Sequence, residues 1–138
     1  LIQARVAELE TGTAFAEDGR MVMLPVGAMW DVVKTPSPLA IPVLERLLAD
    51  PDDTAVLGPV LLDARRELLY WLVSPNSTDS YPPHATLLRA GAWIAAPMPW
   101  SEPLDDAAWA YLPQYPIVTG PAWLAAALDD YGLFGVAA

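Results

Sequence analysis

Two apolar runs joined by a short charged segment constrain the fold of this chain more than any other feature of its sequence. The runs are Val60–Leu62 and Leu68–Val73, and the five residues Asp-Ala-Arg-Arg-Glu separate them. Apolar runs of strand length around a polar connection predict a β-hairpin. Neither run alternates between apolar and polar residues, so we expect the hairpin to lie in the centre of a sheet that is covered on both faces.

Two strands and a helix are expected before this hairpin. The segments 21–25 and 29–36 are apolar, have strand length and end in proline. Ser37 followed by Pro38 predicts a helix start, because serine is a favoured N-cap and proline fits the first helical position. Apolar residues then recur at helical spacing up to residues 49–53, Ala-Asp-Pro-Asp-Asp, where we expect the helix to end.

The rest of the chain predicts shorter elements. Apolar residues at helical spacing predict a short helix over residues 1–10, and Gly-Pro at 120–121 opens a last helix. The segment 85–91 fits either a short helix or a strand, and it precedes an expected strand at 92–99. Residues 100–120 contain three prolines and are expected to form an irregular coat with room for one short strand.

The order of these elements indicates the fold class. It reads helix, strand, strand, helix, hairpin, strand and helix. Three closely spaced strands after a single crossover helix predict a mixed, mostly antiparallel sheet with helices packed on one side. We therefore expect one α+β domain over residues 1–138.

The acidic charge balance excludes several classes of partner. Seventeen Asp and Glu residues face seven Lys and Arg residues, which gives a net charge of -10. A nucleic-acid footprint neutralises about 6 to 10 phosphates, and the basic residues of this chain are scattered along it. We therefore expect no binding to duplex nucleic acid. No apolar run approaches the roughly 18 residues of a membrane span, so we expect no membrane contact and a cytoplasmic protein.

Several kinds of chemistry are missing from the sequence. Without cysteine the chain has no disulfide, no thiolate nucleophile and no zinc–thiolate site. The glycine-rich motifs that bind phosphate groups are absent as well. We therefore expect neither a cofactor nor a bound metal.

Four sequence blocks carry a family resemblance. They are WDVVKTP at 30–36, VLERLL at 43–48, GPVLLDARRELLYWLVSP at 58–75 and LLRAGAWIAAPMP at 87–99. In this order they resemble small actinobacterial proteins related to the N-terminal domain of bifunctional DNA primase/polymerases. The resemblance covers about residues 22–100. It implies a polymerase-type fold in which the strand matching WDVV carries two metal-binding acids, a later strand carries a histidine, and the block ending in AAP closes the nucleotide site.

The catalytic positions of that family are not kept in this chain. Asp31 matches the first acid, but Val33 stands at the second, and one carboxylate cannot clamp two divalent ions. No histidine precedes LLYWLV, and His84 falls in a proline-containing loop. We therefore expect a chain that is not an enzyme and has no catalytic residues. Asp31 is then expected to be a solvent-facing structural acid near Lys34, and His84 a loop residue.

Aromatic residues are the strongest candidates for a contact surface. Trp71 and Trp93 lie within expected strands, and we expect them in the core. The segment 98–116 must either coat its own sheet or present its aromatic side chains to another molecule. Because such side chains are enriched in interface hot spots, we expect partner-binding residues there, namely Trp100, Trp109, Tyr111 and Tyr115.

These observations favour a regulatory or accessory domain that acts by protein–protein contact, with a protein partner or with a second copy in a homodimer. The alternative is a nucleotide-sensing domain that retains a phosphate-binding pocket, with Arg65, Arg66 and Arg89 as its ligand-binding residues. Two further hypotheses stay open. One is an active nucleotidyltransferase, and the other is a nucleic-acid mimic whose acidic side chains gather on one face.

Overall fold

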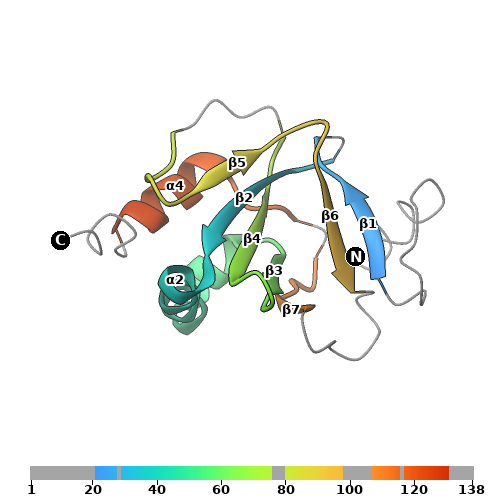
Figure 1. Cartoon of the computed structure of the whole chain (residues 1–138). Helices are drawn as coiled ribbons and strands as arrows, with labels where there is room; N and C mark the ends of the chain where they lie inside the picture. Colours follow the sequence, from blue (N-terminus) through green and yellow to red (C-terminus); the bar gives the residue numbers. More distant parts are fainter. Residues whose placement is uncertain (1–20, 28, 76–79, 98–106, 116, 131–138) are drawn as a thin grey trace.

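A five-stranded antiparallel sheet with the order β5-β2-β4-β3-β7 forms the centre of the chain. The computed structural model describes residues 21–27, 29–75, 80–97, 107–115 and 117–130. A separate antiparallel ribbon pairs β1 with β6 (Figure 1). The strands are β1 Met21–Pro25, β2 Asp31–Pro36, β3 Val60–Asp63, β4 Leu68–Val73, β5 Thr86–Leu88, β6 Trp93–Pro97 and β7 Ala107–Tyr111.

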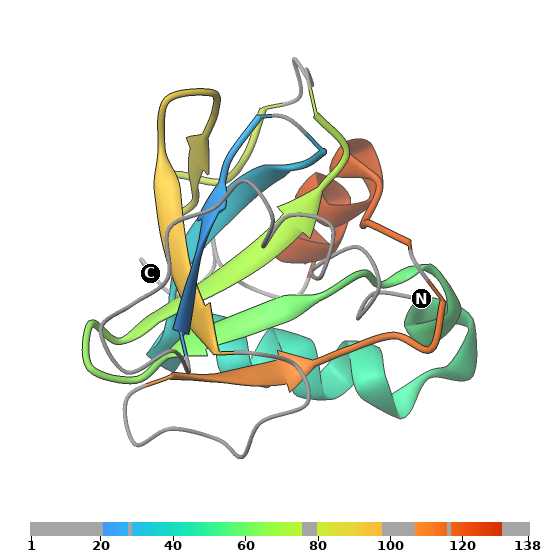
Figure 2. The ribbon, with the colours of Figure 1, turned by 90° about the vertical axis from the view of Figure 1, so that its right-hand side faces the viewer.

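Helices cover one face of this sheet, and the β1–β6 ribbon covers the other (Figures 1 and 2). The helices are α2 Ser37–Ala49, α3 Pro51–Val56 and α4 Pro121–Asp130. Alternate residues of β2 supply the two resulting cores. Val33 packs in the helix-side core with residues of α2 and α4, and Val32 packs in the ribbon-side core with residues of β1 and β6. The predicted α+β fold, with an antiparallel sheet and helices on one side, is confirmed.

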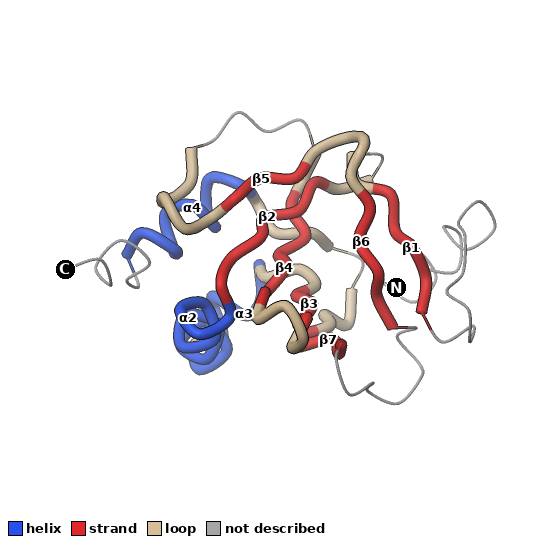
Figure 3. The backbone as a smooth tube through the Cα atoms, in the orientation of Figure 1, coloured by secondary structure: helices blue, strands red, loops and turns tan. Residues whose placement is uncertain are grey.

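The β3–β4 hairpin occupies the middle of the sheet, as its apolar runs predict. β4 lies between β2 and β3, and β3 lies between β4 and β7 (Figure 3). Trp71 points into the helix-side core and Leu72 into the ribbon-side core, and both are fully buried. Because both faces are covered, neither arm has a position for an alternating polar residue.

The start of α2 differs from the prediction by one residue. Pro36 is the N-cap and Ser37 is the first helical residue, and no side chain caps the helix. The Ser37 N–H instead donates to the carbonyl oxygen of Glu67 at 2.8 Å. Glu67 ends the hairpin turn with a positive φ of 57°. A backbone carbonyl from the hairpin therefore accepts one of the free N–H groups at the start of α2, where no side chain caps the helix.

The expected helix end at residues 49–53 is a corner between two helices. Asp50 caps α3, because its Oδ1 accepts a hydrogen bond from the Asp52 N–H at 2.9 Å. The Thr54 hydroxyl group lies 3.1 Å from the Leu47 carbonyl oxygen, so α3 is held against the last turn of α2.

Two segments left open by the sequence each contain a strand. Segment 85–91 contains β5, and segment 100–120 contains β7. The helix predicted over residues 1–10 lies outside the described residues. Within the part of the chain that the structure describes, no helix is both long enough and apolar enough to cross a membrane.

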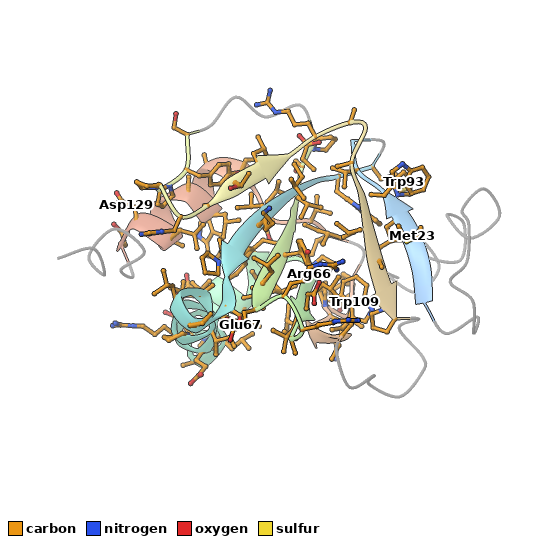
Figure 4. All side chains as sticks on the ribbon, viewed as in Figure 1. Met23, Arg66, Glu67, Trp93, Trp109 and Asp129 are labelled. Carbon is orange, nitrogen blue, oxygen red and sulfur yellow. The ribbon has the colours of Figure 1, made fainter. Side chains whose placement is uncertain are left out.

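Two side chains lie where the sequence did not predict them. Asp31, expected at the solvent, is only 2% exposed. It lies on the same face of β2 as Val33, the helix side, opposite Val73 of β4, whereas Lys34 lies on the other face of the strand. Trp93, expected in the core, is 51% exposed, because it points away from the sheet on the outer face of the ribbon (Figure 4). A two-stranded ribbon buries only one of its faces.

A buried polar network joins β2 to β4 inside the helix-side core. Trp71 Nε1 donates to Thr35 Oγ1 at 2.9 Å, and Thr35 Oγ1 donates to the Leu69 carbonyl oxygen at 3.2 Å. Both side chains are fully buried. A buried donor without an acceptor costs about 1–3 kcal/mol, so the Thr35 hydroxyl group allows a tryptophan to occupy the core.

Replacing Thr35→Val should therefore lower the free energy of unfolding by about 2 kcal/mol or more, because the shape is kept and both hydrogen bonds are lost. Thr35→Ser keeps the hydroxyl group and removes one methyl, so its expected cost is about 1 kcal/mol or less. Urea denaturation of the full chain measures both values. A cost of Thr35→Val no larger than that of Thr35→Ser would contradict the role given to the hydroxyl group.

Candidate functional site

An apolar groove runs between the α2–α3 corner and the segment that follows β7. Its volume is about 650 Å³. The described residues that line it carry no formal charge. Those on the helical wall are Leu48, Pro51, Thr54 and Ala55, and those on the opposite wall are Tyr111, Leu112, Pro113, Gln114, Tyr115 and Ile117.

A bulge in β7 decides which aromatic side chain faces this groove. Leu61 of β3 is in register with Trp109, and Val60 is in register with Tyr111, so one step on β3 corresponds to two steps on β7 around Ala110. In an unbroken strand Trp109 and Tyr111 would point to the same face. With the bulge, Trp109 packs on the ribbon-side core and Tyr111 on the helix-side core.

Hydrogen bonds hold the helical wall of the groove in place. Pro51, Thr54 and Ala55 share one face of α3 because their spacings are three and four. The Thr54 hydroxyl group lies 2.9 Å from the Asp50 carbonyl oxygen, within α3 and its cap. From the opposite wall, the Tyr111 hydroxyl group donates to the Thr54 carbonyl oxygen at 3.4 Å. The helical wall is therefore held by the α2–α3 corner, and the Tyr111 hydroxyl group links the end of β7 to it.

Large apolar side chains border the groove and remain in contact with solvent. Tyr115 is 69% exposed and Leu48 is 38% exposed. A monomeric protein gains nothing from exposed apolar surface around a hollow, and such surface usually marks a place where another molecule binds. This groove is the best candidate for a functional site among the described residues.

The structure separates the four aromatic residues that the sequence predicts as partner-binding. Tyr111 and Tyr115 come together in the groove. Trp109 lies on the other face, against the ribbon-side core, and its Nε1 donates to the Pro97 carbonyl oxygen at 2.8 Å. The indole N–H group of Trp109 is therefore already hydrogen-bonded within the chain. Trp100 lies outside the described residues.

The helical wall of the groove is absent from the sequence-based prediction. Residues 49–53 were expected only to end a helix, so Leu48 and Thr54 were not candidates. A signal was present, because Asp50 followed by Pro51 is a favoured N-cap with a proline at the first helical position. It predicts a second helix start and hence a corner.

The three arginines predicted as ligand-binding residues do not come together. Arg65 and Arg66 lie in the hairpin turn, next to the Pro36 end of β2. Arg89 follows β5 at the opposite end of β2, beside Val32. Four strand positions separate these ends, or roughly 13 Å at about 3.3 Å per residue. One phosphate group cannot contact all three arginines in this arrangement.

The positions that the family resemblance highlights also lie apart. Asp31 and Val33 are on the helix side of β2, where Val33 is fully buried in the apolar core. His84 is exposed in the turn before β5, so its expected place in a loop is confirmed. Among the described residues, no group of three or more His, Asp or Glu side chains could hold a metal ion. The resemblance to primase/polymerase domains stays a prediction.

Comparison of the chain with protein-family models, with curated proteins and with solved structures gave no match. The groove is therefore interpreted from its own residues.

A charged cluster at the hairpin turn is the clearest electrostatic feature outside the groove. Arg66 Nη1 lies 3.0 Å from Asp63 Oδ2, and Asp63 Oδ1 accepts a hydrogen bond from the Arg66 backbone N–H at 3.1 Å. Burial raises the pKa of the Tyr70 hydroxyl group, the Asp63 carboxylate raises that pKa further, and Arg66 lowers it. The folded chain therefore favours neutral Tyr70.

Replacing Asp63→Asn should lower the pKa of Tyr70 toward its ordinary value of 10.0, because a negative charge beside the phenol is removed. Ultraviolet absorbance of the phenolate measures this pKa, and a Tyr70→Phe variant identifies the signal of this tyrosine.

The raised pKa also sets the direction of the pH dependence. The contribution of neutral Tyr70 to the free energy of unfolding is fully present below its pKa in the unfolded chain, about 10. It is lost as the pH rises through the higher pKa of the folded chain. Stability should therefore fall above about pH 10, less steeply in Tyr70→Phe. An unchanged titration of Tyr70 in Asp63→Asn would contradict this account.

Proposed function

We propose that this chain is a non-catalytic protein-interaction domain that binds a segment of a partner protein in the groove between α3 and residues 111–115 and 117. One observation carries the proposal. The groove combines uncharged walls with exposed apolar side chains, Tyr115 and Leu48, on its border. Covering these side chains would remove apolar surface from water, which is the main favourable term in association.

The composition of the groove favours a peptide segment. Small-molecule sites usually contain a few precisely oriented polar groups that fix the ligand, whereas the described walls offer mainly aliphatic, proline and tyrosine side chains. Tyrosine is common at interface hot spots because it supplies a large contact area with few rotatable bonds. The helical wall is held by the α2–α3 corner, and Tyr111 at the end of β7 donates a hydrogen bond to Thr54, so this part of the groove is ordered before binding.

The nucleotide-sensing alternative finds less support in this groove. Phosphate groups are bound by Arg or Lys side chains or by free N–H groups at a helix start. The described lining has no basic residue. At the start of α3, the Asp52 N–H already donates to the Asp50 carboxylate, and both carboxylates repel a phosphate group.

A photo-cross-linking amino acid at position 115 tests the proposal in cells of the native host. The matched control carries the same amino acid at position 93, because Trp93 is the other large aromatic side chain that is more than half exposed among the described residues. We expect position 115 to cross-link to one defined segment of a protein. Mass spectrometry identifies that segment, and the purified pair then gives a dissociation constant.

The same pair of positions provides the mutational test. Tyr115→Ser should weaken binding of the identified segment by at least about tenfold, as expected for a hot-spot aromatic residue. Trp93→Ser removes a similar side chain elsewhere and should leave the affinity unchanged. Calorimetry measures both. An affinity that Tyr115→Ser and Leu48→Ser leave unchanged would refute the groove as the binding site.

A further inference from the structure

We infer that the segment bound in this groove is basic, with lysine or arginine residues on either side of an apolar anchor. This inference rests on the proposed function, since it names the chemistry of the partner for the same groove. Its basis is the charge around the groove, which is separate from the apolar lining.

Acidic side chains flank the helical wall. Asp50 and Asp52 stand on either side of Pro51, a lining residue, and both are exposed. The hydrogen bond from the Asp52 N–H to Asp50 Oδ1 fixes the first carboxylate at this position. Pro51 lines the groove and its two sequence neighbours do not, so the carboxylates of Asp50 and Asp52 lie beside the helical wall and not on the floor of the groove.

Basic residues are nearly absent from the same parts of the chain. Segment 46–59, which includes the helical wall, contains Arg46 and the three acids Asp50, Asp52 and Asp53, so its net charge is 1 − 3 = −2. Segment 107–130, which includes the opposite wall, contains no Lys or Arg. The charge at the border is therefore negative even with the charge of Arg46 included.

This combination fits an occupant with two kinds of side chain. An apolar anchor can enter between Tyr111 and Tyr115, where no charged group has to lose its water. Lysine or arginine residues beside the anchor would then meet Asp50 and Asp52 at the border, where charges orient the partner and speed association. The exposed ring of Tyr115 can also contact a cation through its face.

The net charge of the chain favours such a partner over a second copy. A second copy would bring the same net charge of −10 to this border, and like charges placed together oppose binding. Acidic partners are disfavoured for the same reason.

The test uses three synthetic peptides with one proline-containing apolar core and different flanks. The flanks contain lysine and arginine in the first peptide, glutamate and aspartate in the second, and serine and glutamine in the third. Fluorescence anisotropy with the full chain gives the three affinities. We expect the basic peptide to bind at least about tenfold more tightly than the acidic one, because each border charge adds a modest attraction that becomes repulsion on reversal. Raising the salt from about 50 mM to about 300 mM should weaken its binding severalfold.

Two double variants localise the charge effect. Asp50→Asn with Asp52→Asn removes two charges at the groove, and asparagine keeps the helix cap. We expect about threefold weaker binding of the basic peptide and no change for the neutral peptide. Asp129→Asn with Asp130→Asn removes the same charge from the end of α4, which does not line the groove. That control should change the affinity by less than about twofold.

The outcomes separate this inference from the proposed function. Equal affinity for basic and neutral peptides, lost in Tyr115→Ser, would refute the basic occupant and leave the groove as a docking site. Tighter binding of the acidic peptide would refute it as well. A change in oligomeric state caused by Tyr115→Ser would identify a second copy as the occupant and refute the basic segment. If no peptide binds, the basic occupant is refuted, and cross-linking from position 115 decides the function independently.

Discussion

The β3–β4 hairpin is apolar on both faces, so it can be buried only between two layers. The chain supplies these layers from different parts of its sequence. α2 and α4 cover one face, while β1 and β6, which are far apart along the chain, form the ribbon that covers the other. The groove exists because α2 packs on the hairpin, α3 is held against the last turn of α2, and β7 extends the same sheet next to β3. The β3–β4 hairpin, which must be buried on both faces, therefore determines where the two walls of the groove lie.

The opposite wall is fixed to the hairpin at both of its ends. At one end Tyr111 is in register with Val60 of β3. At the other end the Thr119 N–H donates to the Leu72 carbonyl oxygen at 3.1 Å, and Thr119 Oγ1 accepts from the Gly58 N–H at 2.8 Å. A side chain at Gly58 would place its Cβ 2.7 Å from the backbone of Thr119, so only glycine allows this approach. These attachments position the two ends of the segment that follows β7, whose described residues form no helix or strand before Thr119.

Sequence reasoning reached the features that depend on local patterns. The hairpin, its central position, α2 and the antiparallel sheet follow from runs of apolar residues and from proline positions. The errors arose where tertiary context decides. Asp31 is buried on the first position of β2, opposite Val73 of β4, and Trp93 is exposed because β6 pairs with β1 and not with the main sheet. Strand pairing between segments far apart in the sequence leaves no local signal.

The sequence predicted one wall of the groove, since Tyr111 and Tyr115 were candidates. The bulge that separates Tyr111 from Trp109 cannot be read from alternating residues.

The acidic border of the groove also has a structural cause. A carboxylate at the N-cap and in the first turn stabilises a helix, because it accepts free N–H groups and faces the positive end of the helix dipole. Asp50 and Asp52 serve α3 in this way whether or not a partner binds. Their charge at the border therefore needs no selection for binding to explain it. The two roles can still be separated, because asparagine keeps the capping hydrogen bond and loses the charge. A loss of affinity without a loss of stability would assign the charge to recognition, and a loss of both would assign it to the helix.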